Sequence, residues 1–346
     1  MTALDPVAAS PVVRLNWLDV AKGMGILLVI FGHAVGGFRD AGMVNADGVL
    51  GTSFYTVYTF HMPLFMFLSG MLIQRRLEKG RLPFLKSLGT SIILPYLIWA
   101  PIVVLVLGAV GGLTNGGEGR SLTHSLVAIL WGPPGWLWFF YSLLLCHLTA
   151  VVMPYGRYGL LLLALCLIPL SLLIKLPIVL SMTSRMLIFY ALGVLIGPAL
   201  TTRQMQVPSW APAALAIPFA VAVWLALSKG VGYWSVQAIP AAICGAAAVL
   251  AASAGPLFQN NRWIAYIGKR SMAIYVLHVF FVAGVRIAFD KILGYREVAV
   301  TLPISLFAGL LGPLICYEIA SRLKISEWVG LGKPIAWKRS AVVAQA

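Results

Sequence analysis

Charged residues are scarce in this chain. They make up 10% of its 346 residues, whereas 60% are hydrophobic, and the mean hydropathy is +0.93. A soluble domain carries roughly a quarter charged residues, so this composition excludes a soluble globular fold. The long apolar runs do not alternate with polar residues, which excludes a membrane β-barrel. The sequence therefore predicts an all-α fold, a polytopic membrane helix bundle.

Common catalytic and metal-binding motifs are also missing. The chain has no G-x-S-x-G, no H-E-x-x-H and no P-loop, which excludes the usual hydrolase, zinc-protease and nucleotide sites. No basic region followed by a cleavage site marks the N-terminus, so no removable signal peptide is expected. No metal site is predicted, because the cysteines lie inside apolar runs without a C-x-x-C and are expected to be packing residues. They are Cys146, Cys166, Cys244 and Cys316.

The sequence does contain about ten apolar runs, each near the roughly 20 residues that a transmembrane helix needs. We expect them to form spans at 22–38, 56–74, 88–111, 135–153, 159–176, 185–200, 210–228, 236–254, 271–289 and 299–319. The lipid bilayer is therefore an expected partner.

The basic residues predict the orientation of these spans. If the N-terminus is inside, about two thirds of the 25 Lys and Arg residues fall on the inner side, as cytoplasmic loops require. We therefore expect a multi-pass protein of the cell (inner or plasma) membrane with both termini cytoplasmic. Residues 1–13 and 321–346 would be tails around a transmembrane domain at 14–320. The net charge of +15 is scattered between apolar runs, so no nucleic acid partner is predicted.

The first two spans contain ionisable residues. Lys22 and His33 are eleven residues apart, which places them on one helix face about 16 Å apart. Asp19 is expected to fix the Lys22 side chain or to cap the helix start. The second span returns antiparallel and puts His61 at the depth of His33. Ionisable groups inside a membrane are costly and commonly functional, so both histidines are candidate catalytic residues. Neutral packed histidines are the alternative, and the Met-Pro pair after His61 also indicates a bend.

A basic loop follows the second span. Its five cations are Arg75, Arg76, Lys79, Arg81 and Lys86. Such loops commonly set topology and meet lipid headgroups. Because Lys22 would lie at the same surface, the alternative is a docking site for a polyanionic cytosolic cofactor.

Aromatic and polar residues mark the fourth and ninth spans. Trp136 and Trp138 open the fourth span, where aromatic residues usually anchor a helix at the interface; a platform for a sugar ring is the alternative. In the ninth span, Ser271, Tyr275 and His278 follow a basic pair, and His278 shares a face with Ser271. His278 is either a packed polar group or a functional residue, and the sequence leaves both alternatives open.

Two arginines, Arg185 and Arg286, lie near the outer ends of their spans. Long cationic side chains at such positions usually snorkel toward the interface, and we expect this for both. The alternative is a pocket for an anionic acceptor.

Taken in order, these motifs resemble the acyltransferase 3 family of integral membrane O-acyltransferases. Leu18-Asp19…Lys22-Gly23…Gly32-His33 is similar to the first-helix signature, and the stretch 60–70 resembles the second-helix signature of fucose 4-O-acetylase-like members. Further similar blocks lie at 94–96, 136–139, 190–193 and 267–278, so the resemblance runs from about residue 14 to 320. The chain differs from the family in one respect: it lacks an Arg-x-x-Arg pair before Leu94-Pro-Tyr96, where only Lys86 is basic.

The resemblance implies transfer of an acyl group, usually acetyl from acetyl-CoA, to a hydroxyl of a carbohydrate or lipid-linked glycan. His33 would then be the general base, with His61 as a second catalytic residue. The donor phosphates would bind to Lys22, Arg75, Arg76, Lys79, Arg81 and Lys86, and the acceptor to Asp19, Trp136, Trp138, Tyr275 and His278. Two alternatives stay open: a multi-span transporter or flippase, and a non-catalytic membrane partner of the same fold.

Overall fold

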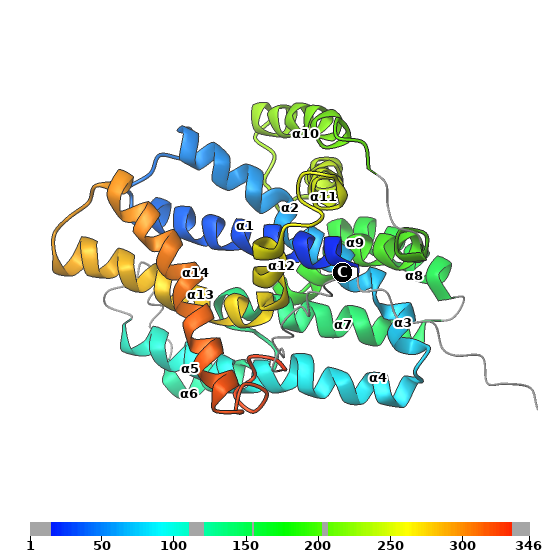
Figure 1. Ribbon diagram of the computed structural model, residues 1–346, viewed down its shortest axis with the longest axis horizontal. Helices are drawn as coiled ribbons and strands as arrows, with labels where there is room; N and C mark the ends of the chain where they lie inside the picture. Colours follow the sequence, from blue (N-terminus) through cyan, green and yellow to red (C-terminus); the bar gives the residue numbers. More distant parts are fainter. Residues whose placement is uncertain (1–14, 111–120, 154–155, 203–206, 334–346) are drawn as a thin grey trace, which may run out of the picture.

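The computed structural model describes residues 15–110, 121–153, 156–202 and 207–333. These residues form a bundle of helices (Figure 1). Within these ranges there is no β-strand, and ten helices are long and apolar enough to cross a membrane. The predicted all-α membrane bundle is therefore confirmed. The expected tail 1–13, and residues 334–346 of the other expected tail, lie outside the described residues.

The ten spans lie where the apolar runs predict them. They are α1 (Asn16–Asp40), α2 (Val49–Met71) continued by α3 (Ile73–Leu77), α4 (Arg81–Leu88) continued by η1 (Gly89–Ile93) and α5 (Leu94–Ala109), η3 (Gly135–Leu137) with α7 (Trp138–Val152), α8 (Gly156–Leu173), α9 (Ile178–Thr202), α10 (Ala211–Ser228), η4 (Val236–Ala238) with α11 (Ile239–Ala254), α13 (Ser271–Ile287) with η5 (Ala288–Ile292), and α14 (Val298–Arg322). Two short helices lie between the spans, α6 (Leu122–Ala128) and α12 (Arg262–Lys269).

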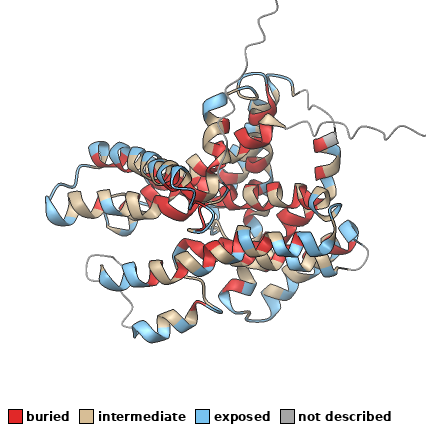
Figure 2. Cartoon of the chain, turned by 60° about the horizontal axis from the view of Figure 1, so that its bottom comes forward, coloured by how far each residue is buried: buried red, intermediate tan, exposed pale blue. Residues whose placement is uncertain are grey.

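Helix α1 forms the centre of the bundle. It packs against α2, α11, α12, α13 and α14, and its side chains Val20, Ala21, Ile26, Val29 and Ala34 have no exposed surface. Figure 2 shows buried residues gathered toward the middle of the bundle and exposed residues at its periphery. In the outer helices α8 and α10, only 17% and 11% of the residues in the most apolar 18-residue stretch are buried. Their remaining apolar residues are free to contact lipid. The first span is thus surrounded by protein, as a helix with polar side chains requires.

Glycines allow the closest helix contacts. A Cβ at Gly70 of α2 would overlap the carbonyl oxygen of Tyr190 on α9, and a Cβ at Gly193 of α9 would overlap that of Phe67 on α2. Helix α12 crosses α1 in the same way at Gly268. Small residues let helix backbones approach in a membrane, where packing rather than water exclusion drives association.

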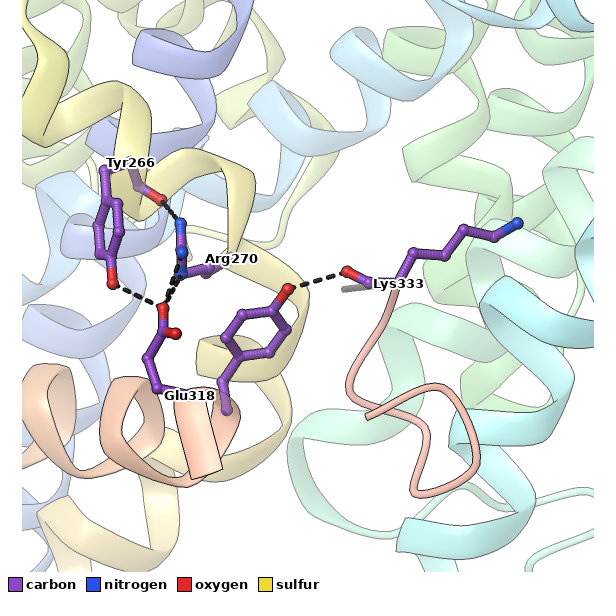
Figure 3. Close-up of polar contacts among 5 residues, drawn as sticks. Tyr266, Arg270, Glu318 and Lys333 are labelled. Carbon is purple, nitrogen blue, oxygen red and sulfur yellow. Dashed lines mark hydrogen bonds and ion pairs between the residues drawn. The ribbon is translucent and has the colours of Figure 1, made fainter. Parts of the chain in front are cut away.

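An ion pair connects α14 with the turn between α12 and α13 (Figure 3). Arg270 is 4% exposed, and its Nη2 donates to Glu318 Oε1 at 2.7 Å, while its guanidinium lies 3.5 Å from the ring centre of Tyr266. The hydroxyl of Tyr266 donates to the same carboxylate oxygen at 2.8 Å. Tyr317 donates to the carbonyl oxygen of Lys333 at 2.8 Å. The described part of the expected C-terminal tail therefore packs back onto the bundle.

Candidate functional site

Two cavities lie along helix α1. The first, here called the Lys22 cavity, has a volume of about 220 Å³ and is lined by Lys22, Arg76, His147 and Tyr275 among others. The second, the His33 cavity, has a volume of about 280 Å³ and includes His33 in its wall. Since Lys22 and His33 are eleven residues apart on α1, the cavities occupy two depths of the bundle about 16 Å apart.

The Lys22 side chain is held by the acid that precedes it. Its Nζ lies 3.8 Å from Oδ1 of Asp19, which is 7% exposed. The pair spans three residues of one helix, the spacing at which side chains on a helix meet. The structure therefore places Asp19 beside Lys22 and outside the wall of the His33 cavity, although the sequence analysis expects it among the acceptor-binding residues.

Of the five cations that follow the second span, one lines the Lys22 cavity. Arg76 lines it, whereas Nη2 of Arg75 donates to the carbonyl oxygen of Thr201 at 2.6 Å. The other three, Lys79, Arg81 and Lys86, are exposed and line neither cavity. The structure thus brings two of the six expected donor-binding residues together, Lys22 and Arg76.

His147 also lines the Lys22 cavity, and sequence reasoning missed it. It is 1% exposed, its Nδ1 donates to the carbonyl oxygen of Leu143 at 2.8 Å, and its ring stacks 5.5 Å from that of Phe84. A second ring, Tyr190, lies 5.3 Å away. The signal that could have found His147 is the one that found His33, an ionisable residue inside an apolar span.

Three histidines from three helices meet next to the His33 cavity. The ring of His33 on α1 lies 5.0 Å from that of His278 on α13 and 6.0 Å from that of Tyr58 on α2. His61, one turn from Tyr58 on α2, lies 4.9 Å from the Tyr58 ring. His61 and His278 are buried, whereas His33 is partly exposed and lines the cavity. The structure therefore groups the two candidate catalytic histidines with His278.

The backbone fixes the tautomers of the two buried histidines. Nδ1 of His61 lies 2.7 Å from the carbonyl oxygen of Val57, and Nδ1 of His278 lies 2.8 Å from that of Tyr275. A carbonyl oxygen only accepts, so each Nδ1 must donate, which leaves a lone pair on each Nε2 of the neutral ring. Within the described residues, Nε2 of His278 is buried without a hydrogen-bond partner. His33 therefore has an unused acceptor close to it. No group of three or more His, Cys, Asp or Glu in the described ranges could hold a metal ion.

Tyr275 and Trp136 lie between the two cavities. Tyr275 lines the Lys22 cavity and donates its hydroxyl to the carbonyl oxygen of Trp136. The Trp136 ring lies 6.4 Å from that of His278, three residues after Tyr275 on α13. The other expected acceptor residue, Trp138, is partly exposed, packs 4.9 Å from Trp234 and lines neither cavity. The tryptophans of the fourth span thus lie outside the His33 cavity wall.

The His33 cavity is enclosed by matching faces of two helices. It is lined by His33, Gly36, Gly37 and Asp40 from α1, and by Val279, Val282, Ala283 and Arg286 from α13. Both sets follow the i, i+3, i+4, i+7 spacing of a single helix face. Aromatic rings from α2 and the turn before α11 complete the wall: the Tyr58 ring lies 4.0 Å from Phe54 and 5.3 Å from Tyr233. The cavity therefore combines a histidine, two arginines (Arg39 and Arg286), the carboxylate of Asp40 and aromatic faces.

One of the comparisons with known proteins identifies a family. The acyltransferase 3 family model, described as an acyltransferase domain, matches residues 15–318. No curated protein and no solved structure matches the chain. Because the matched stretch covers most of the sequence, the chain belongs to the acyltransferase 3 family, and the predicted family is confirmed. With ten apolar helices in the described part of the chain, it is an integral multi-pass membrane acyltransferase.

Proposed function

We propose that this acyltransferase 3 protein moves an acyl group, in the first instance acetyl, from cytosolic acetyl-CoA to a hydroxyl group of a glycan on the other side of the membrane. A carbohydrate or a lipid-linked glycan would be the acceptor, as for the fucose 4-O-acetylase-like members. One observation carries the proposal: two cavities at different depths flank a cluster of three histidines on α1, α2 and α13.

The Lys22 cavity is the proposed donor site. The excess of basic residues on the side of Lys22 orients that side toward the cytoplasm, where acetyl-CoA is available. Lys22 and Arg76 line this cavity. A lysine contacts phosphate as a point charge, and an arginine binds it with a planar pair of N–H groups. These two residues would hold the phosphates while the thioester extends toward Tyr275 and the histidines.

His33 is the proposed general base, because it lines the acceptor cavity and lies beside the other histidines. It takes the proton of the acceptor hydroxyl as the oxygen attacks the thioester carbonyl carbon. The carbon–sulfur bond breaks, and the leaving coenzyme thiolate takes the proton from the imidazolium. Imidazole suits this role because it exchanges protons near neutral pH. A two-step route, in which the acyl group first rests on the imidazole, uses the same contacts.

His278 is proposed to position this base. Its Nε2 has a lone pair and no partner among the described residues, and its ring lies 5.0 Å from that of His33. An N–H of His33 directed at this acceptor would turn the other ring nitrogen toward the cavity. A base that is oriented by a third group is the usual arrangement in proton-transfer sites. His61, whose ring lies 4.9 Å from that of Tyr58, would support the cluster from α2.

Replacing His33 tests the proposal. Purified protein in membranes is incubated with labelled acetyl-CoA and a glycan fraction, and acceptor-dependent release of coenzyme is measured. Loss of a general base should lower kcat about 10²–10⁴-fold in His33→Ala. His124→Ala is the matched control, because His124 is exposed and lines neither cavity. Near-normal transfer by His33→Ala at normal protein levels would show that His33 is not the base.

A further inference from the structure

We propose that the His33 cavity selects an acceptor that carries an anionic group, a carboxylate or a phosphate, and that Arg286 binds this group. The inference rests on the proposed function, because it names the class of acceptor for the same site. It starts from the one cationic side chain of α13 that lines the His33 cavity.

Arg286 is a buried cation with an unused donor. It is 6% exposed, and within the described residues its Nη1 is buried and has no hydrogen-bond partner. Arg185, in the first half of α9, differs: it donates to Ser181 Oγ at 2.6 Å and also to the carbonyl oxygen of Trp234. A buried charged donor without a partner is strongly unfavourable, so an incoming anion is the partner that would satisfy Arg286. The snorkelling expected for Arg286 is wrong, because its side chain is enclosed by protein.

The two carboxylates near Arg286 are shared with other cations, although Oδ2 of Asp290 has no hydrogen-bond partner among the described residues. Asp290 and Asp40 both interact electrostatically with Arg286. The ion pairs that engage them are Arg296–Asp290 at 3.2 Å, Lys291–Asp290 at 3.6 Å and Arg39–Asp40 at 3.9 Å. Four cationic side chains therefore share two carboxylates in this part of the structure, which leaves a positive local charge at the cavity. Such a site attracts anions.

The position of Arg286 relative to His33 suits a substrate of one sugar ring. A Cβ built on Gly37 would lie 3.4 Å from Nε of Arg286, and Gly37 follows His33 by one helical turn. The guanidinium therefore contacts α1 about 5–6 Å above the imidazole along the axis. A sugar acid or sugar phosphate separates its charge from a ring hydroxyl by a comparable length. The anion could thus bind Arg286 while a hydroxyl of the same residue meets His33.

The remaining wall suits the ring itself. The rings of Phe54, Tyr58 and Tyr233 lie within 5.7 Å of one another and line the cavity. Aromatic faces offer an apolar surface with a negative centre, on which the C–H groups of a sugar ring can pack. Gly36 and Gly37 contribute no side chain, and this keeps about 280 Å³ open. The cavity therefore has the size and the surfaces for one anionic sugar residue.

A binding experiment with full-length protein in nanodiscs tests this inference without acyl transfer. The probes are methyl glucuronide for a carboxylate, glucose 6-phosphate for a phosphate, and uncharged methyl glucoside. Thermal shift and tryptophan fluorescence report their binding. We expect at least one anionic probe to bind tenfold or more tightly than methyl glucoside. Arg286→Gln should abolish this preference, and Arg286→Lys should retain part of it. Lys229→Gln, which removes an exposed cation at the end of α10, should leave the preference unchanged.

The outcomes separate this inference from the proposed function. His33→Ala should keep the preference for the anionic probe while it loses transfer, so a failure of transfer alone leaves the anion site standing. Equal binding of charged and uncharged probes by the wild-type protein, or no binding of either anionic probe, would overturn the inference. An unchanged preference in a folded Arg286→Gln protein would do the same. If Arg286→Gln does not fold, the test uses the wild-type preference for anionic probes and the preference of Arg286→Lys, and absence of the preference in the wild-type protein would overturn the inference.

Discussion

Two substitutions of His278 distinguish a residue that positions the base from one that only packs. An Asn at this position keeps an N–H donor near the place of Nδ1, which donates to the carbonyl oxygens of Ile274 and Tyr275 at 3.0 Å and 2.8 Å. It removes the Nε2 acceptor, which is buried without a hydrogen-bond partner among the described residues. A Gln keeps a polar atom near the place of Nε2 but gives up the bond to the backbone. The two variants therefore remove different halves of the same imidazole.

The size of the effect follows from the contact that is lost. A hydrogen bond between neutral groups contributes about 0.5–1.5 kcal/mol, which corresponds to a change of about twofold to tenfold in rate. His278→Asn should therefore lower kcat by about that factor, while His278→Gln should retain more of the activity. Both losses are smaller than the roughly 10²–10⁴-fold loss expected for the base. The KM for acetyl-CoA should stay unchanged, because Lys22 and Arg76 are not altered.

Initial rates of acceptor-dependent coenzyme release give kcat and KM for each variant. Thermal unfolding of the same preparations shows whether the protein is folded. Wild-type kcat in His278→Asn would refute the positioning role and leave His278 as a packed residue. A loss of kcat in His278→Asn as large as that in His33→Ala would also refute the positioning role, because His278 would then be the base itself.

Two further substitution pairs test the donor site and the helix packing. Arg76→Gln should raise the KM for acetyl-CoA about tenfold in steady-state kinetics, as expected for the loss of one charge-assisted hydrogen bond. Arg75→Gln should leave this KM unchanged, because Arg75 donates to a backbone carbonyl and does not line the Lys22 cavity. Equal effects of the two substitutions would contradict the assignment of Arg76 to the donor site. Gly193→Ala should destabilise the protein by about 1–3 kcal/mol in thermal unfolding, because the new Cβ overlaps a carbonyl oxygen of α2. Gly284→Ala should leave the stability unchanged, because a Cβ there has no atom within 4 Å. An equal loss of stability in both variants would argue against close α2–α9 packing.

The spans were predictable because hydropathy reports the environment that a helix meets. Ten apolar runs correspond to the ten candidate membrane spans among the described residues. Hydropathy does not report where a helix ends: α1 begins at Asn16 rather than at 22, and α2 at Val49 rather than at 56. In both, the helix extends through a stretch that mixes apolar with polar residues, such as Asn16 and Asp19 in α1 and Thr52 and Ser53 in α2. Helix α12 (Arg262–Lys269) was missed because its eight residues are too few for a span.

The site was predictable where helix geometry decides it. Antiparallel neighbours at one depth place His33 and His61 near each other, and both histidines contact Tyr58 in the structure. Spacing cannot distinguish Arg75 from Arg76, because adjacent residues point about 100° apart and only the packing of α3 selects the one that faces the cavity. The same limit applies to His278, whose neighbour His33 comes from a helix distant in sequence. Contacts between distant segments were therefore the part that sequence alone did not supply.

The positions of charged side chains from the Lys22 cavity to the His33 cavity suggest how acyl transfer across the membrane could avoid moving a charge. Cations line both cavities, Lys22 and Arg76 at one depth and Arg39 and Arg286 at the other. Between them lie imidazoles and aromatic rings, and backbone carbonyl oxygens accept from Nδ1 of His61 and of His278. In the proposed reaction the donor phosphates stay at Lys22, and the acceptor anion stays at Arg286. Only an uncharged acyl group passes between them, so the protein avoids the cost of moving a charge through a low-dielectric core. This division explains why α1 has a cation at one depth and an imidazole about three turns away.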